Sequence, residues 1–416
     1  MALVFAAFCP NPDPLSPLNP GSTSSRADAR PRLALIGISG YGRIHLQLAR
    51  ACRDRGEADI VAAVVINPAE EEANVAELRA HGCEIYPDYL EMLRRHAGQI
   101  DVCLIPTGIH WHARMTLAAL SAGANVLVEK PLAGSVADAA AIQAAERASG
   151  RFVAVGFQDC YDPGTRWLAD ELRRGVIGEV RAVRFLGVWP RPRAYYQRNN
   201  WAGRLQVDGV AVLDSPLNNA FGHFVMLSLL FAGAEAGEVA PPAEGVELFR
   251  AHAIESFDTG VVSFRTRQGV HLWFGASHAS HTAIEPGIMI EGTAGTAGWR
   301  YESEAWFEAA GGRQQRPVLD QHATRHLMMA AVLQRLRGPA TICTTDLAAR
   351  HTALIEGIHR AAPVEAFPAD RIEWAGEGAA AIPAVAGLDA ALRLAFTGQR
   401  SLRDVGFSLV AGPAGH

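Results

Sequence analysis

One short stretch near the start of the chain limits the fold more than any other. Residues 33–43 (LALIGISGYGR) join an apolar run of strand length to a turn of small residues, and helical periodicity follows as far as Cys52. A strand, a glycine-rich turn and a helix start form the front of a βαβ unit that binds dinucleotides, because backbone N–H groups and the positive end of the helix dipole face a diphosphate. An ordinary tight turn between a strand and a helix is the alternative.

The turn departs from the usual G-x-G-x-x-G spacing at one position. The pattern occurs as Gly37, Ser39 and Gly42, so serine stands where a glycine would let the backbone approach the phosphates. Serine is small and its hydroxyl can donate to a phosphate oxygen. The residues of this turn that we expect to contact a cofactor are Gly37, Ser39, Gly40, Tyr41, Gly42 and Arg43.

Composition excludes several classes of protein. The chain has 416 residues, of which 49 % are apolar and 19 % charged, which is typical of a globular protein with room for two domains. A net charge of −5 argues against a nucleic-acid or anionic-membrane partner, and no apolar run reaches the length of a membrane span. The six cysteines are scattered without a C-x-x-C pair, so we expect no disulfide framework, no metal site and a cytoplasmic location.

The first 31 residues differ from the rest. They are rich in proline and serine and lack the basic start of an export signal, although they begin with a short apolar run. We interpret residues 1–31 as a disordered extension, with a translation start placed too early as one explanation and a cryptic export signal as the less favoured one.

Buried strands alternate with helices in the next part of the chain. Apolar runs of strand length lie at residues 33–36, 60–67, 101–106, 125–129 and 152–157, and helical patterns lie at 44–52, 70–81, 88–93, 111–122 and 137–148. This alternation predicts an α/β fold with a doubly wound parallel sheet over residues 32–157. Ligands of such sheets lie at the carboxyl ends of the strands.

Several polar residues stand at those strand ends. Asn67 ends the second strand, where an acidic residue would accept hydrogen bonds from the adenosine ribose of NAD. Asparagine can bond a ribose hydroxyl without repelling a 2′-phosphate, so both NAD and NADP stay open as cofactors. The other residues that we expect at this edge are Thr107, His110, His112, Glu129 and Lys130.

At this point the chain resembles the Gfo/Idh/MocA-type NAD(P)-dependent oxidoreductases, the family of glucose–fructose oxidoreductase and inositol dehydrogenase. The segment GISGYGRIH resembles the family's phosphate turn, and residues 106–131 (PTGIHWHARMTLAALSAGANVLVEKP) resemble its segment ending in Glu-Lys-Pro. Further on, GVIGEVRAV (175–183) and IEGTAGTAGW (290–299) resemble the openings of strands in the family's second domain. The resemblance covers about residues 32 to 410.

Lys130 is the residue on which the predicted chemistry depends. A lysine at the end of a buried strand has a lowered pKa, which suits it to take or share a proton near neutrality, although a lysine that merely reaches out to solvent is the alternative. The resemblance implies that Glu129 holds the nicotinamide ribose or orients Lys130, and that Thr107 and His112 fall on the family's threonine and histidine. We place His110 and His112 on an extended segment, pointing to opposite sides.

The second half of the chain, residues 158–416, has an α+β pattern. A helical pattern at 165–174 precedes alternating strands at 180–189 and within 256–274, the latter with a turn at Gln268-Gly269, and a long helix is predicted at 344–360. The resemblance implies an open, mostly antiparallel sheet that binds substrate and forms homo-oligomers. The intervening loop is rich in groups that suit a polyhydroxylated or carboxylated ligand, and a plain surface loop is the alternative. Its predicted substrate-binding residues are Tyr195, Arg198, Asn200 and Trp201.

The segment after this loop departs from the family pattern. Asp214 stands where the family has its aspartate, but Asn218 stands where a histidine is usual, and we count Asn218 among the substrate-binding residues. Asn219 and His223 are four residues apart and therefore share a helix face. Either His223 takes over proton transfer with Asn219 fixing the substrate, or Lys130 works alone, or His223 is an ordinary core histidine. The predicted catalytic residues are Lys130, Asp214, Asn219 and His223.

The sequence thus predicts an NAD(P)-dependent oxidoreductase that moves a hydride between a nicotinamide and a sugar, cyclitol or related hydroxy compound. Two alternatives stay open. One is a redox-neutral, glycosidase-like enzyme that retains its NAD, and the other is a sensor or regulatory protein that binds a dinucleotide without turnover.

Overall fold

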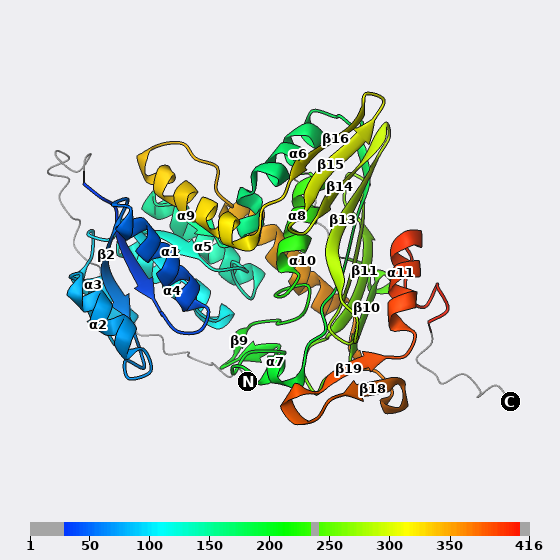
Figure 1. Ribbon diagram of the computed structural model, residues 1–416, viewed down its shortest axis with the longest axis horizontal. Coiled ribbons are helices and arrows are strands. Elements are labelled where there is room, and N and C mark those ends of the chain that lie inside the picture. The colour runs from blue at the N-terminus through cyan, green and yellow to red at the C-terminus, as the bar shows by residue number, and fades with distance from the viewer. Residues whose placement is uncertain (1–28, 234–240, 408–416) are drawn as a thin grey trace, which may run out of the picture. The chain divides into compact units, whose positions relative to one another are not determined.

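The structure is a computed structural model, and it describes residues 29–233 and 241–407 (Figure 1). The predicted N-terminal extension lies outside the described residues as far as position 28. The described residues from Pro31 onward form one compact unit, which contains two large sheets. The boundary that we expect after residue 157 stays a prediction.

The first sheet is parallel throughout and has the order β3-β2-β1-β4-β5-β6. Its strands are β1 (Arg32–Ile36), β2 (Asp59–Val64), β3 (Glu84–Tyr86), β4 (Val102–Ile105), β5 (Asn125–Val128) and β6 (Val153–Val155). The central strands are continuous apolar runs because helices cover both faces of the sheet. The predicted doubly wound parallel sheet is therefore confirmed, with the short β3 as a strand that the apolar pattern did not show.

Five helices connect these strands: α1 (Gly42–Asp54), α2 (Glu72–Ala80), α3 (Tyr89–Arg95), α4 (Ile109–Ser121) and α5 (Val136–Ser149). Side-chain caps fix two of their starts. Asp88 accepts a hydrogen bond from the Glu91 N–H, and Ser135 accepts one from the Asp138 N–H. Gly150 ends α5 with a φ of +64°, which glycine adopts at little cost.

The second sheet has nine strands in the order β16-β15-β14-β13-β7-β12-β11-β10-β17. They are β7 (Val180–Val188), β10 (Val246–Arg250), β11 (Thr259–Arg265), β12 (His271–Ser277), β13 (Ile284–Gly292), β14 (Gly295–Arg300), β15 (Glu304–Ala309), β16 (Gly312–Pro317) and β17 (Val364–Ala366). Neighbours are antiparallel except in the pairs β7–β12 and β10–β17. The mostly antiparallel second sheet is thus confirmed, and the predicted turn at Gln268-Gly269 joins β11 to β12.

Helices of this second half lie on both faces of the sheet. The helices are α6 (Pro163–Arg173), α7 (Arg193–Gln197), α8 (Gly222–Phe231), α9 (Gln321–Arg337), α10 (Thr345–Ala361) and α11 (Leu388–Gly398), and the two small hairpins are β8 (Gln206–Val207) with β9 (Val210–Ala211) and β18 (Ile372–Ala375) with β19 (Ile382–Val385). Phe224 of α8 stacks on Phe185 of β7. The helix α11 lies on the other side of the sheet (Figure 1), and its Leu388 and Leu392 join a separate apolar cluster with Trp273 of β12. Part of the face that we expected to be open is therefore covered by α11.

Candidate functional site

The glycine turn between β1 and α1 has the geometry that a bound diphosphate requires. Gly37 and Gly40 have φ values of +95° and +55°, which favour glycine. A Cβ at Gly42 would lie 2.7 Å from the Gly37 carbonyl oxygen, so the chain can turn here only with glycine. Ser39, Gly40 and Tyr41 are exposed in front of the helix start. The turn therefore fits a dinucleotide, and Ser39 does not obstruct it.

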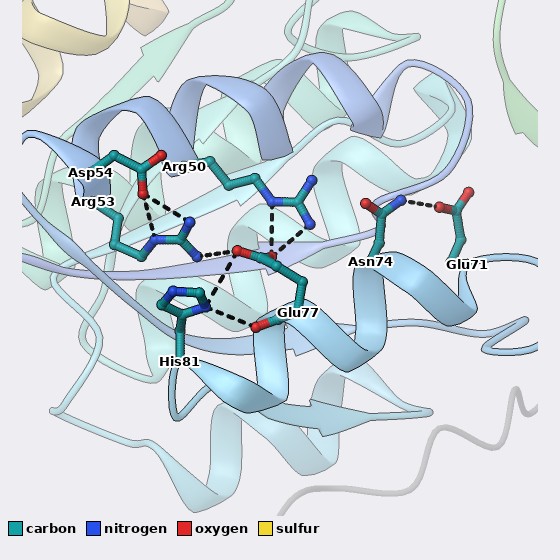
Figure 2. Close-up of polar contacts among 7 residues, drawn as sticks. All are labelled: Arg50, Arg53, Asp54, Glu71, Asn74, Glu77 and His81. Carbon is teal, nitrogen blue, oxygen red and sulfur yellow. Dashed lines mark hydrogen bonds and ion pairs between the residues drawn. The ribbon is translucent and has the colours of Figure 1, made fainter.

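Next to the turn, where we expected Asn67 to contact the cofactor, the structure has an ion pair. Asn67 is exposed after β2, while Arg43 Nη2 lies 2.8 Å from Oε1 of the buried Glu71. Asn74 donates to the other carboxylate oxygen of Glu71 at 2.5 Å (Figure 2). The bond from Arg43 keeps the pKa of Glu71 below its usual range. Sequence reasoning missed Glu71, which lies four residues beyond the position that it examined.

A second set of ion pairs fastens α1 to α2 beside this one (Figure 2). Arg50 Nη2 and Arg53 Nη1 each lie 2.6 Å from a carboxylate oxygen of Glu77. Partial burial raises the pKa of Glu77, but the hydrogen bonds from Arg53 and Arg50 lower it further, so that the net direction is downward. These contacts hold α2 against α1 and so keep Glu71 beside the turn.

Lys130 is held at the end of β5 by one residue of the second half. Its Nζ donates to the Asn219 carbonyl oxygen at 2.9 Å and to Asn219 Oδ1 at 2.7 Å. The Asn219 amide in turn donates to Asp214 Oδ1 at 3.0 Å, and Asp214 Oδ2 accepts the Gly203 N–H at 2.6 Å. Burial lowers the pKa of Lys130. The charges of Glu129 and Asp214 act in the opposite direction but do not restore the usual value. The structure thus brings together Lys130, Asp214 and Asn219, which the sequence grouped.

Lys130 is also the one lysine in a sequence whose lysines and arginines total 38. Arginine stays protonated at any physiological pH, whereas a lysine ammonium loses its proton when its pKa is lowered. Every other basic position therefore carries either an arginine, whose charge is fixed, or a histidine. The position at the end of β5 alone carries a lysine.

A buried histidine that the sequence analysis did not select lies behind Lys130. His45 Nε2 is 2.8 Å from Glu129 Oε1, and Glu129 Oε2 accepts the Lys130 N–H at 3.0 Å. Burial raises the pKa of Glu129, but the contact with His45 lowers it further and leaves it below its usual range. The signal was present in the sequence, because His45 ends the segment GISGYGRIH that carries the family resemblance.

A cavity of about 500 Å³ opens in front of Lys130 and contains His223. His223 Nδ1 lies 3.1 Å from Asp159 Oδ2, within ion-pair distance although not aligned for a hydrogen bond. Asp159 belongs to a 3-10 turn, Gln158–Tyr161, that follows β6 and that sequence reasoning missed. The cavity is lined by Tyr41, Lys130, Gln158, Asp159, Trp189, Pro190, Arg191, Asn219, Ala220, His223, Phe224, Tyr301, Gln321 and Arg325. Because His223 lines this cavity, the structure does not favour the interpretation of His223 as an ordinary core histidine.

Three sequence interpretations need correction. His110 and His112 lie in α4 rather than on an extended segment, because the helix begins at Ile109. His112 is fully buried, with its ring nitrogens 2.7 Å from the Pro131 carbonyl oxygen and 3.1 Å from that of Thr107, so it fastens two loops and has no free face. Asn218 is also buried, and its amide donates to the carbonyl oxygens of Val212 and Leu213 instead of lining the cavity.

The loop residues predicted to bind substrate lie outside the cavity of Lys130. The Arg198 guanidinium packs 3.8 Å from the Tyr195 ring centre and 5.2 Å from that of Trp201, while Asn200 is exposed. Trp201 joins an apolar cluster with Ile109. Neighbouring residues of the loop line a separate cavity of about 650 Å³, whose wall includes Arg193, Tyr196, Asn199, Arg204, His252 and Trp374.

Within the described parts of the chain, no group of three or more His, Cys, Asp or Glu side chains is arranged to hold a metal ion. Among the helices of the same residues, none is long and apolar enough to cross a bilayer.

Comparison with known proteins places residues 32–157 in a family model described as the oxidoreductase family GFO_IDH_MocA, NAD-binding Rossmann fold. The chain is 34 % identical over 149 residues to the inositol 2-dehydrogenase of Pseudomonas fluorescens and 36 % identical over 146 residues to that of Azotobacter vinelandii. These matches cover 36 % and 35 % of this chain, and 43 % and 42 % of the relatives. The chain thus matches less than half the length of these relatives.

Solved structures are similar over a longer stretch. The WlbA dehydrogenase of Bordetella pertussis, in complex with NADH and UDP-GlcNAcA, gives a TM-score of 0.63 at 24 % identity over 80 % of this chain and 96 % of that one. An oxidoreductase domain protein of Kribbella flavida gives 0.67 at 20 % identity, with 80 % and 96 % covered. At this level of identity the likeness concerns the fold.

Proposed function

We propose that this chain is an NAD(P)-dependent dehydrogenase of a sugar, cyclitol or related hydroxy compound and a member of the Gfo/Idh/MocA oxidoreductase family, whose model residues 32–157 match. The similarity to inositol 2-dehydrogenases supports a polyol or sugar substrate. The observation that carries the proposal is that Lys130, with a lowered pKa, lines one cavity together with Tyr41 of the glycine turn and His223.

The chain's own groups account for the proton side of such a reaction. The bound nicotinamide would supply the hydride acceptor, so a C–OH group becomes C=O as hydride leaves the carbon and the hydroxyl proton goes to the protein. A neutral Lys130 takes that proton, and the two oxygens of Asn219 then stabilise the ammonium that forms. Glu129 holds the Lys130 backbone N–H and fixes where the side chain starts.

His223 is the second proton-handling group of the cavity. It shares a wall with Lys130, and the Asp159 carboxylate lies 3.1 Å from its Nδ1. In this arrangement His223 replaces the histidine that the family pattern would place at position 218. The alternative, in which Lys130 works alone, differs in one result: a His223→Gln variant would keep its full kcat.

The experiment is a turnover assay that follows the absorbance of the reduced nicotinamide with both coenzymes and a panel of inositols, hexoses and sugar acids. We expect net reduction of coenzyme with one member of the panel, and a loss of about 10²- to 10⁴-fold in kcat for Lys130→Met. Lys130→Arg keeps the charge but cannot give up a proton, so it should be as inactive as Lys130→Met.

Three results would contradict the proposal. Full activity of Lys130→Arg would show that only the charge matters. Substrate conversion without net coenzyme reduction would favour the redox-neutral enzyme. Coenzyme binding without any turnover, unchanged in Lys130→Met, would favour a sensor. The predicted homo-oligomer and the cytoplasmic location belong to the proposal too, and sedimentation of the purified protein tests the first of them.

A further inference from the structure

Two partly buried arginines in the wall of the Lys130 cavity have no carboxylate partner among the described residues. Arg191 follows β7, and Arg325 lies in the first turns of α9. Both side chains are partly buried, and the Nε atom of each is buried without a hydrogen-bond partner. Within the described residues, no carboxylate lies within ion-pair distance of either guanidinium.

A third arginine with an unpartnered Nε shows the difference. Arg184 also has a buried Nε without a partner, but its Nη1 lies 2.7 Å from a carboxylate oxygen of Glu291. Arg191 instead packs against aromatic rings, 4.8 Å from the ring centre of Tyr195 and 5.5 Å from that of Trp189. Withdrawing a guanidinium from water without a counter-charge is costly, so two such groups in one cavity indicate an anion that arrives with the ligand.

The position of Arg191 is fixed by its backbone. The Arg191 N–H donates to the His278 carbonyl oxygen at 3.2 Å, and the Arg191 carbonyl oxygen lies 3.1 Å from His252 Nε2. Arg325 is oriented by its side chain, since Nη2 donates to Gln321 Oε1 at 2.5 Å and the guanidinium lies 5.7 Å from the Tyr41 ring centre. The Arg191 backbone and the Arg325 guanidinium are therefore held in place before any ligand binds.

The remaining polar groups of the cavity do not cancel this charge. Asp159 is the carboxylate of the lining, and it is within ion-pair distance of His223. Gln158, Gln321 and Tyr301 add neutral donors and acceptors that suit hydroxyl groups. The cavity thus combines hydrogen-bonding groups for a polyol with two guanidinium groups for an anion.

From this arrangement we infer that the substrate of the proposed dehydrogenase is a hydroxy compound carrying a carboxylate or a phosphate, which Arg191 and Arg325 bind. That this ligand is a substrate rests on the proposed function, whereas the preference of the cavity for an anion rests on the two guanidinium groups. The planar fork of arginine matches a carboxylate or phosphate through two parallel hydrogen bonds. A neutral polyol of the same size would leave both guanidinium groups without a counter-charge.

The test is binding of three matched probes to the full chain, with and without NAD, by titration calorimetry. D-Glucose is neutral, D-glucuronate carries a carboxylate and D-glucose 6-phosphate carries a phosphate on the same ring. We expect at least one charged probe to bind at least tenfold more tightly than glucose, and the one that does identifies the anion. Arg191→Gln and Arg325→Gln should each remove most of this preference, and the double variant should remove all of it.

Arg173→Gln is the matched control, because it makes the same charge change on the exposed ion pair of α6 with Asp170. It should leave the preference intact, and thermal unfolding of all variants shows whether they fold. Equal binding of glucose and both charged probes, absence of binding by either charged probe, or a preference that survives the double variant would each overturn the inference. A weaker NAD affinity of Arg325→Gln with unchanged probe selectivity would assign Arg325 to the coenzyme and overturn the two-arginine site.

These outcomes are separate from those of the proposed function. Anion-selective binding without coenzyme reduction by any hydroxy compound would overturn the dehydrogenase proposal and leave the anion site. Turnover of neutral polyols alone, with no charged probe bound, would overturn the anion site and leave the dehydrogenase proposal.

Discussion

His45 Nε2 lies 2.8 Å from Glu129 Oε1, and both side chains are almost completely buried. This contact joins the helix of the glycine turn to the strand end that carries Lys130. It therefore connects the groups that hold a coenzyme to the group that we propose takes a proton.

Replacing His45 with leucine should destabilise the protein by about 3 kcal/mol, because it leaves the Glu129 carboxylate buried without its partner. The pKa of Glu129 lies below its unfolded value, so its contribution to stability is present above pH ~4.3 and is lost as the pH falls through the folded pKa. In His45→Leu the lowering by His45 is lost, and although Lys130 and His223 still oppose burial, the pKa of Glu129 should rise. The deficit in unfolding free energy should consequently be largest near neutral pH and shrink toward pH 4.

Denaturant unfolding at several pH values measures this effect. His81→Leu is a suitable control, since His81 is exposed and its ion pair with Glu77 should contribute less than about 1 kcal/mol. A deficit for His45→Leu that is the same at every pH would indicate lost packing rather than a lost charge partner.

The single lysine makes the pKa of the proposed proton acceptor directly measurable. In protein labelled only at lysine, one side-chain resonance reports Lys130. We expect it to titrate below the usual 10.5, because burial lowers the pKa of Lys130. Asn219→Asp would place a carboxylate at the position that now lies 2.7 Å from Nζ and should raise the pKa of Lys130, because a nearby negative charge favours the ammonium.

The pH profile of kcat/KM should move in the same direction. A base must be neutral to act, so the rate rises as pH passes the pKa of Lys130, and this limb should shift to higher pH in Asn219→Asp. A resonance that moves while the rate profile stays in place would mean that Lys130 does not limit the reaction as a base.

The sequence predicts those parts of the molecule that depend on local pattern. Apolar runs bounded by glycines specify the parallel sheet, and Asp88 specifies a helix start, because each depends on residues close along the chain. The cavity depends on contacts across long separations. Arg325 meets Tyr41 from a helix almost 300 residues away, and nothing in the pattern around either residue indicates that contact.

The error at Asn218 has a different origin. The alignment to the family pattern fixed the histidine position by counting from Asp214, whereas Asn218 folds back onto the carbonyl groups of Val212 and Leu213. The next residue, Asn219, then reaches Lys130. Spacing alone could not reveal this, since Leu213 has a positive φ of 50° that a pattern of residue types does not specify.

Gly42→Ala should both destabilise the chain and abolish coenzyme binding. The added methyl group would lie 2.7 Å from the Gly37 carbonyl oxygen, and relieving that clash must move the turn at a cost of about 1–3 kcal/mol. Gly40→Ala is the matched control. Its Cβ would meet no atom within 4 Å, and the left-handed φ alone costs about 1 kcal/mol. Calorimetric titration with NAD and NADP checks both, and NAD binding by Gly42→Ala at the wild-type affinity would contradict the assignment of the turn.

The choice between NAD and NADP depends, in our view, on Glu71. Its carboxylate is paired with Arg43 beside the glycine turn, so that Arg43 is not available to a 2′-phosphate, and the negative charge of Glu71 would repel that phosphate. Glu71→Gln removes this charge and leaves Arg43 available to a phosphate, so we expect the ratio of NADP to NAD affinity to rise about tenfold. Glu77→Gln makes the same change within α2, the helix that Glu71 precedes, at a carboxylate bound by Arg50 and Arg53, and should not alter the ratio. An equal rise in both variants would mean that net charge, rather than the Arg43–Glu71 pair, sets the preference.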